Sequence, residues 1–234
     1  MIGIAPDNVR LVSLQACDGA RCPLAYVLEA IDMAIDAGVD VVSWSVNYIF
    51  NSSSSVERSL LTRAWRQAQL HDMILVTPAG NDGVSAENHY PCWYGGYNTI
   101  CVAALSGDVN YTLAEFSNYG ERVDIAAFGE NMYVGSDWLG HDQWSSGTSY
   151  ATSVVSAAAA MILSLNVEPS MVKRILLTEA EVFETPGKHL RSHGGALNIL
   201  WSIKRAIRMY KPRPTPSQEA NTPQYPRPYR KGFC

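Results

Sequence analysis

The chain lacks any uninterrupted run of 18 or more apolar residues, which argues against a membrane-spanning helix. It also lacks an excess of basic residues, and the formal net charge of −4 argues against a nucleic-acid-binding protein. Charged residues make up only 17% of the 234 residues and hydrophobic residues 47%, so the chain can bury a sizeable core. The composition therefore predicts one large folded domain or two small ones.

Cysteine is scarce, with five residues in the whole chain. Four of them form pairs that are close in sequence, Cys17 with Cys22 and Cys92 with Cys101, and Cys234 is left over. The sequence alone leaves disulfides and free buried thiols equally open, and disulfides would imply a secretory route.

The first residues, Met-Ile-Gly-Ile-Ala-Pro, have neither the basic nor the apolar region of a signal peptide. Two sequons for N-glycosylation, at Asn51 and Asn110, nonetheless favour secretion. We therefore expect a secreted protein or one resident in the secretory pathway.

Strand-like and helix-like apolar patterns alternate along most of the chain. Such alternation is typical of an α/β fold, in which right-handed crossovers join the strands of a parallel sheet. Strands are expected over Val9–Leu14, Val39–Val46, Met73–Thr77, Thr99–Leu105 and Arg122–Ala127, and helices over Ala25–Ala37, Val56–His71, Ser170–Glu179 and Ala196–Tyr210.

The composition changes at Lys211. Six prolines fall in the last 24 residues, and five basic residues against one acidic residue give this segment a charge of +4, so the remainder carries −8. We expect a domain over residues 1–210 and a proline-rich basic tail over 211–234 that is extended and disordered. A ligand for a proline-recognising module is the alternative.

Ser149 stands at the expected start of a helix. Gly140–Ser146 reads as a polar loop, and Ala151–Leu165 has no charge, glycine or proline, which predicts a helix buried on every side. Backbone N–H groups in a first helical turn lack partners and lie at the positive end of the dipole, where they would stabilise an oxyanion. The alternative is that Ser149 merely caps a core helix.

Two loops leave neighbouring predicted strands at their carboxyl ends, where open parallel sheets form their sites. One is Ser45–Asn47 and the other is Pro78–Gly83. Asn81, between two glycines, has the position and side chain of an oxyanion-hole donor. The alternative is that Gly-Asn-Asp-Gly is only a turn.

Together these segments resemble the subtilisin-like serine proteases. Gly147–Ala151 resembles the family's Gly-Thr-Ser-x-Ala nucleophile motif, Pro78–Gly83 its Ala-Gly-Asn-x-Gly loop, and Val41–Asn47 its strand ending in Ser-Leu-Gly. The resemblance covers residues 3–208. Lesser matches occur in the family's order at Gly3–Pro6, Tyr90–Pro91, Phe116–Gly120, Val123–Ala126 and Gly195–Asn198.

The resemblance implies a three-layer α/β fold with a mostly parallel central sheet. It also implies that Ser149 is the nucleophile and that the side chain of Asn81 and the Ser149 N–H form the oxyanion hole. The pocket walls would come from Ser45, Val46, Asn47, Ala79 and Gly80, with a protein or peptide as substrate. Family members often bind calcium, but no ligand set for it is evident in the sequence.

Two catalytic segments of the family have no match in this chain. Gly-Ile-Ala-Pro begins at residue 3, and nothing in the chain matches the family's Asp segment or its His-Gly-Thr-His helix. We therefore expect an N-terminally truncated domain that is inactive alone, with a non-catalytic peptide-binding pseudoprotease as the alternative. His141, with Asp137 or Asp142, is the one conceivable substitute base.

The chain also differs from the family at three single positions within the matched segments. Asn47 replaces a glycine and is expected to narrow the cleft, whereas Phe128 and Ser153 replace prolines and are expected to affect local packing. An α/β-hydrolase elbow around Ser149 is rejected, because it needs a buried strand directly before the serine and Gly140–Ser146 is too polar to form one.

Overall fold

The computed structural model describes residues 4–5, 9–19, 21–50, 54–107, 111–191 and 194–210. The tail from Lys211 and the sequon asparagines Asn51 and Asn110 lie outside this range, so the expectations for them stay predictions. No helix in the described part of the chain is both long and apolar enough to cross a membrane.

A parallel sheet forms the centre of the molecule, with the strand order β1-β3-β5-β6. The pairing of β1 with β3 confirms the predicted neighbourhood of the strands that precede the two candidate loops. The bounds are β1 Val41–Ser43, β3 Ile74–Pro78, β5 Thr99–Leu105 and β6 Ile125–Phe128.

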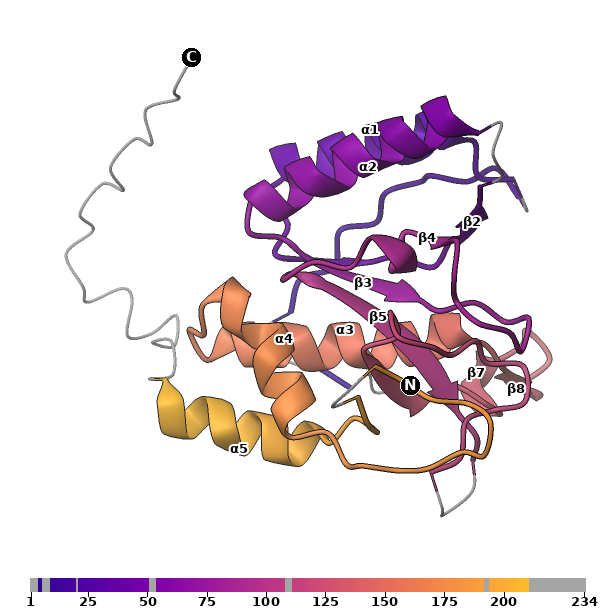
Figure 1. The fold of residues 1–234 in the computed structure, drawn as a ribbon, viewed down its shortest axis with the longest axis vertical. Coiled ribbons are helices and arrows are strands. Elements are labelled where there is room, and N and C mark those ends of the chain that lie inside the picture. The colour runs from indigo at the N-terminus through magenta and orange to yellow at the C-terminus, as the bar shows by residue number, and fades with distance from the viewer. Residues whose placement is uncertain are drawn as a thin grey trace.

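Helices cover both faces of this sheet, which confirms the predicted three-layer α/β architecture (Figure 1). Helices α1 and α2 form one outer layer, and α3, α4 and α5 form the other (Figure 1). The bounds are α1 Leu24–Asp36, α2 Ser55–Leu70, α3 Thr148–Ser164, α4 Pro169–Thr178 and α5 Ile199–Met209.

Helix α1 forms because its apolar residues recur at helical spacing. Val27, Ile31 and Ala34 are buried on one face and pack with Trp65 of α2 in the core between this layer and the sheet. The helix ends before Gly38, whose φ of +63° suits the left-handed conformation in which helices commonly terminate.

Helix α3 is the central helix of the other layer and packs on all four strands of the sheet. Ala151, Ala158 and Ala159 are fully buried, and their short side chains let the helix lie close to the strands. The predicted burial holds along most of the helix, although Ser153 is exposed.

A buried charge network ties α4 to the sheet at the amino end of β6. Asp124 accepts hydrogen bonds from Lys173 Nζ at 2.9 Å, from Arg191 Nη1 at 2.5 Å and from the Cys101 N–H at 2.9 Å. Burial lowers the pKa of Lys173, and the Asp124 carboxylate partly offsets this effect. The network accounts structurally for the aspartate in the Val-Asp-Ile-Ala motif.

The strand predicted over Val9–Leu14 is wrong. These residues pair with no strand in the described chain, and the side chains of Leu11 and Val12 are 90% and 47% exposed. The strand predicted over Val39–Val46 is present but shorter than expected: β1 consists of only three residues, Val41–Ser43. Among the described strands it has a single neighbour, β3. Apolar patterning therefore overestimated both segments, because a strand exists only where another strand bonds to it.

The loop predicted over Gly140–Ser146 is also wrong, because β8 (Asp142–Ser145) lies within it and pairs with β7 (Met132–Ser136). This antiparallel hairpin lies outside the central sheet and is largely exposed, so its polar sequence gave no strand signal. A second small pair joins β2 (Tyr48–Ile49) to β4 (His89–Tyr90), which precedes the 3₁₀ helix η1 (Cys92–Tyr94).

Both sequence-local cysteine pairs form disulfides in the structure. Cys92 in η1 and Cys101 in β5 have Cα atoms 5.0 Å apart, and those of Cys17 and Cys22 are 4.1 Å apart. The expectation that Cys92 and Cys101 come within bridging distance is therefore confirmed.

The Cys92–Cys101 bridge should be present and should stabilise the fold. Closing a loop of this length contributes about 2–3 kcal/mol by chain entropy, so the Cys92→Ala/Cys101→Ala double variant should unfold at lower denaturant concentration. Mass spectrometry of secreted, non-reduced protein should find the linked peptides. Two free thiols in that material would contradict both the bridge and the inference of an oxidising compartment.

Candidate active site

Ser149 lies in the first turn of α3 and is half-buried. The helix begins at Thr148 with Gly147 as its N-cap, and no side chain caps it, so the interpretation of Ser149 as a cap is wrong. The N–H of Gly147 donates to the Gly129 carbonyl at 2.8 Å, which fastens the helix start to the residue that follows β6.

Asn81 is bonded directly to the residue before Ser149. Its Oδ1 accepts two hydrogen bonds from Thr148, one from the backbone N–H and one from Oγ1, each at 2.8 Å. Since consecutive Cα atoms are about 3.8 Å apart, these bonds place Asn81 Oδ1 within about 8 Å of the Ser149 Cα. The structure thus brings the two predicted residues to the same helix terminus.

The two loops predicted as pocket walls are also joined. With its amide oriented to satisfy both atoms, Asn47 donates to the Pro78 carbonyl at 3.1 Å and accepts from the Gly80 N–H at 3.2 Å. The same N–H lies 3.3 Å from Thr148 Oγ1. Ser45 and Val46 follow β1, Ala79 and Gly80 follow β3, and the Asn47 side chain bridges the two loops at the carboxyl ends of these neighbouring strands.

Asn118 holds the loop around Asn81 from within the fold. This fully buried side chain accepts from the N–H groups of Asp82 and Val84 at 3.0 and 3.1 Å and donates to the Ala79 carbonyl at 3.1 Å. The segment is thus not a free hydrogen-bonded turn but an irregular bend that is tied both to α3 and to a buried amide.

Gly80 is required at its position for two reasons. Its φ is +113°, and a Cβ there would lie 2.3 Å from Asn118 Nδ2 and 2.9 Å from His89 Nδ1. The backbone therefore passes directly over these two buried side chains.

His89 is a further polar group of this region, and its side chain is only 6% exposed. Its ring nitrogens lie 3.3 and 3.4 Å from Asn118 Nδ2, and the Asp82 carboxylate is 3.9 Å from Nδ1. Burial lowers the pKa of His89, and Asp82 partly counteracts the effect. His89, Asn118 and the hydroxyl of Thr148 were not predicted from the sequence as parts of the site; only the match at Phe116–Gly120 pointed to Asn118.

A model of the subtilase family matches residues 1–215. The chain belongs to the subtilase family. It is 35% identical over 157 residues to halolysin of Haloferax mediterranei, covering 66% of this chain and 28% of that protein. It is 30% identical over 185 residues to the major intracellular serine protease of Bacillus subtilis, covering 77% and 54%.

Solved structures agree with this assignment. The prenylagaramide maturation protease PagA has a TM-score of 0.68 at 26% identity, covering 82% of this chain and 71% of that one. The epidermin leader peptide processing serine protease of Staphylococcus aureus has the same fold, with a TM-score of 0.75 at 24% identity, covering 88% and 60%. The chain spans between about a quarter and rather more than half of the curated relatives it matches.

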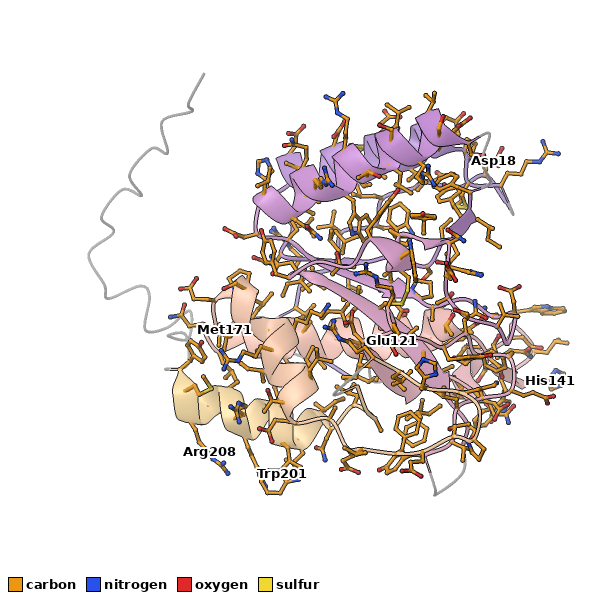
Figure 2. The ribbon with its side chains drawn as sticks, in the orientation of Figure 1. Asp18, Glu121, His141, Met171, Trp201 and Arg208 are labelled. Atoms are coloured by element: carbon orange, nitrogen blue, oxygen red, sulfur yellow. A yellow bond between two sulfur atoms is a disulfide. The ribbon has the colours of Figure 1, made fainter. Side chains whose placement is uncertain are left out.

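The histidines that the structure describes are engaged elsewhere than at Ser149. His141 bonds to Asp137 at 3.2 Å in the exposed turn of the β7–β8 hairpin, and Figure 2 shows it at the outer edge of the molecule. The four residues of β8 separate it from the root of the hairpin by roughly 13 Å, and its ring bonds to Asp137 rather than to Ser149.

Two other histidines have partners or positions of their own. His189 pairs with Glu121 at 3.3 Å, and His71 caps the end of α2, while His193 lies outside the described residues. Within the part of the chain that the structure describes, no histidine or carboxylate bonds to the Ser149 hydroxyl.

The segment before Ser149 does not form an α/β-hydrolase elbow, but the reason differs from the one expected from the sequence. A strand, β8, does precede Gly147, but it pairs only with β7 and is exposed along most of its length. A nucleophile elbow needs a buried strand of the central sheet.

Among the described residues, no three His, Cys, Asp or Glu side chains come together in a group that could bind calcium. The residues described thus do not fit a calcium site built mainly from carboxylates.

Removing the Thr148 hydroxyl should loosen this site. Thr148→Val deletes the Oγ1 bond to Asn81 and the contact with the Gly80 N–H, and we expect a loss of about 2–3 kcal/mol in unfolding free energy, because two polar groups lose a partner. Thr148→Ser keeps the hydroxyl and should lose only about 1 kcal/mol, from the missing methyl group. Urea unfolding of both variants measures this, and an equal loss in the two would contradict a role for the hydroxyl.

Burial of His89 should make stability depend on pH. The unfolded chain binds a proton at His89 below its ordinary pKa of 6.5, whereas the folded protein resists it, so stability is full above 6.5 and falls as the pH drops through the lowered pKa. His89→Gln should flatten the decline of unfolding free energy that sets in as the pH falls below about 6.5. His71→Gln, at an exposed histidine, is the matched control; a His89→Gln slope equal to wild type would refute the assignment.

Proposed function

We propose that this chain supplies the nucleophile and the oxyanion hole of a subtilisin-like serine endopeptidase. Ser149 attacks the peptide carbonyl to form an acyl-enzyme, which water then hydrolyses. Membership of the subtilase family supports the reaction class. The observation that carries the residue assignment is the pair of bonds from Thr148 to Asn81 Oδ1.

Those bonds orient the Asn81 amide. Because Oδ1 is occupied, Nδ2 is the remaining donor, and it has no partner among the described residues. On α3, Asn81 takes the Thr148 N–H and Gly147 takes the Tyr150 N–H, which leaves the Ser149 N–H without a partner in the described chain. Two free donors at a helix N-terminus suit a developing oxyanion.

The residues at the ends of β1 and β3 would bind the substrate. In this proposal Ser45, Val46 and Asn47 form one wall of the pocket for the residue before the scissile bond, and Ala79 and Gly80 form the other. The bonds of Asn47 to Pro78 and Gly80 support a shared pocket, since they hold the two walls together.

We further propose that these 234 residues contain no general base for Ser149. The family's Asp and His motifs have no counterpart in the sequence, and the described histidines are engaged elsewhere. A serine hydroxyl without a base stays protonated and is weakly nucleophilic. The chain alone would then retain only the acceleration that oxyanion stabilisation and binding provide, about 10³–10⁴-fold over the uncatalysed reaction.

A peptide-binding pseudoprotease is the second candidate. It is favoured by β1, which pairs only with β3 among the described strands and so leaves one edge for an extended peptide. For either function we propose that the protein is located in the secretory pathway or secreted, and the two disulfides support this location.

The test compares the chain alone with the chain fused after a relative's segment carrying the Asp strand and the His-Gly-Thr-His helix. The chain alone should show no enzymatic turnover of an unstructured peptide and little labelling by a fluorophosphonate. The fusion should be active, Ser149→Ala should abolish its activity, and Asn81→Ala should lower kcat about 10²–10³-fold, a magnitude established on a subtilisin.

Ser153→Ala, one turn further along α3, is the matched control and should leave the fusion active. Robust turnover by the chain alone that Ser149→Ala abolishes would overturn the absence of a base. A folded fusion that binds peptide without cleaving it would favour the pseudoprotease.

A further inference from the structure

Helix α5 carries basic residues and no acidic ones. Its inward face packs on the core through buried Ser202 and Ala206 and through the partly buried Ile199 and Ile203. This packing fixes which residues of the helix face outward.

The outward face of α5 is unusually apolar for a surface. The exposed fractions are 60% for Leu200, 45% for Trp201, 51% for Ile207 and 47% for Met209. Helical spacing places Lys204 between Leu200 and Ile207, and it places Trp201, Lys204 and Arg208 along one stripe. Figure 2 shows Trp201 and Arg208 projecting from α5 away from the body of the molecule.

The charges on this face are positive and largely uncompensated. Lys204 Nζ lies 4.4 Å from the centre of the Trp201 ring, and neither Lys204 nor Arg208 forms an ion pair with a described residue. Arg205, by contrast, pairs with Glu179 at 2.8 Å. The face therefore combines exposed apolar side chains with two free cations.

The sequence that follows α5 has the same sign of charge. Residues 199–214 contain five basic residues and no acidic one, although the body of the protein is acidic overall. A uniformly basic stretch is complementary to an anionic surface.

We propose that the outward face of α5 docks on an anionic lipid bilayer. Leu200, Trp201 and Ile207 would enter the boundary between headgroups and acyl chains, and Lys204 and Arg208 would meet the anionic headgroups. A convex helix presenting aromatic and aliphatic side chains beside long basic ones matches the graded polarity of a bilayer interface. Apolar burial and basic charge are two separate contributions, as stable peripheral binding requires.

The docking face lies apart from the candidate active site. In Figure 1, α5 is at the opposite side of the view from the β7–β8 hairpin that leads into α3. The bilayer would therefore hold the protein without covering Ser149, and the proposal does not depend on the proposed function.

Flotation of the full chain with vesicles tests the proposal and separates binding from aggregation. Wild type should float with phosphatidylcholine vesicles containing about one third phosphatidylserine, should not float with pure phosphatidylcholine, and should bind less as salt rises. Lys204→Gln/Arg208→Gln should weaken binding about 30-fold. Leu200→Gln/Ile207→Gln should weaken it roughly tenfold.

Arg63→Gln/Arg66→Gln is the matched control, because it removes the same charge from exposed positions of α2 in the opposite helical layer. It should bind nearly as well as wild type, and circular dichroism should show that all variants fold. An equal loss in this control, an unchanged affinity of Leu200→Gln/Ile207→Gln, or no flotation of wild type at about 0.1 M salt would overturn the proposal. Binding to polyglutamate but not to the vesicles would likewise overturn it in favour of an acidic protein partner.

Discussion

The hydrogen bonds between Thr148 and Asn81 join the two parts of the chain from which the candidate site is built. One part is the loop that leaves β3, and the other is the start of α3. Without them the Asn81 amide would rotate freely on an exposed loop. With them it has one orientation, and its remaining donor stands next to the first turn that carries Ser149.

Buried polar residues around the loop hold this junction in place. The Asn118 side chain bonds to three backbone groups of the loop, and Gly80 allows the backbone to pass over His89 and Asn118 without a side chain of its own. Asn47 then ties the end of β1 to the same loop. The geometry is thus preorganised by buried polar groups, which retain their hydrogen bonds only if the loop keeps its shape.

Sequence patterns predicted the central architecture well, because α1 buries apolar residues at helical spacing and β3, β5 and α3 are continuous apolar or small-residue segments in the core. They failed where pairing decides the structure. Val9–Leu14 has apolar residues but no partner strand in the part of the chain that the structure describes, and β8 has a polar sequence but pairs with β7. Of the site, motif resemblance supplied Ser149 and Asn81, whereas His89 and Thr148 became visible only through three-dimensional contacts between distant segments.

The bonded residues Asn81 and Thr148 are far apart along the chain, so their contact depends on folding of the segment between them. Asn81 and Thr148 are 67 positions apart, and β5, β6 and the β7–β8 hairpin lie between them. Contacts of such separation form only after the intervening chain has lost most of its conformational freedom. In a growing or partly folded polypeptide Ser149 and Asn81 are therefore not yet held together, and assembly of the candidate site is coupled to completion of the fold.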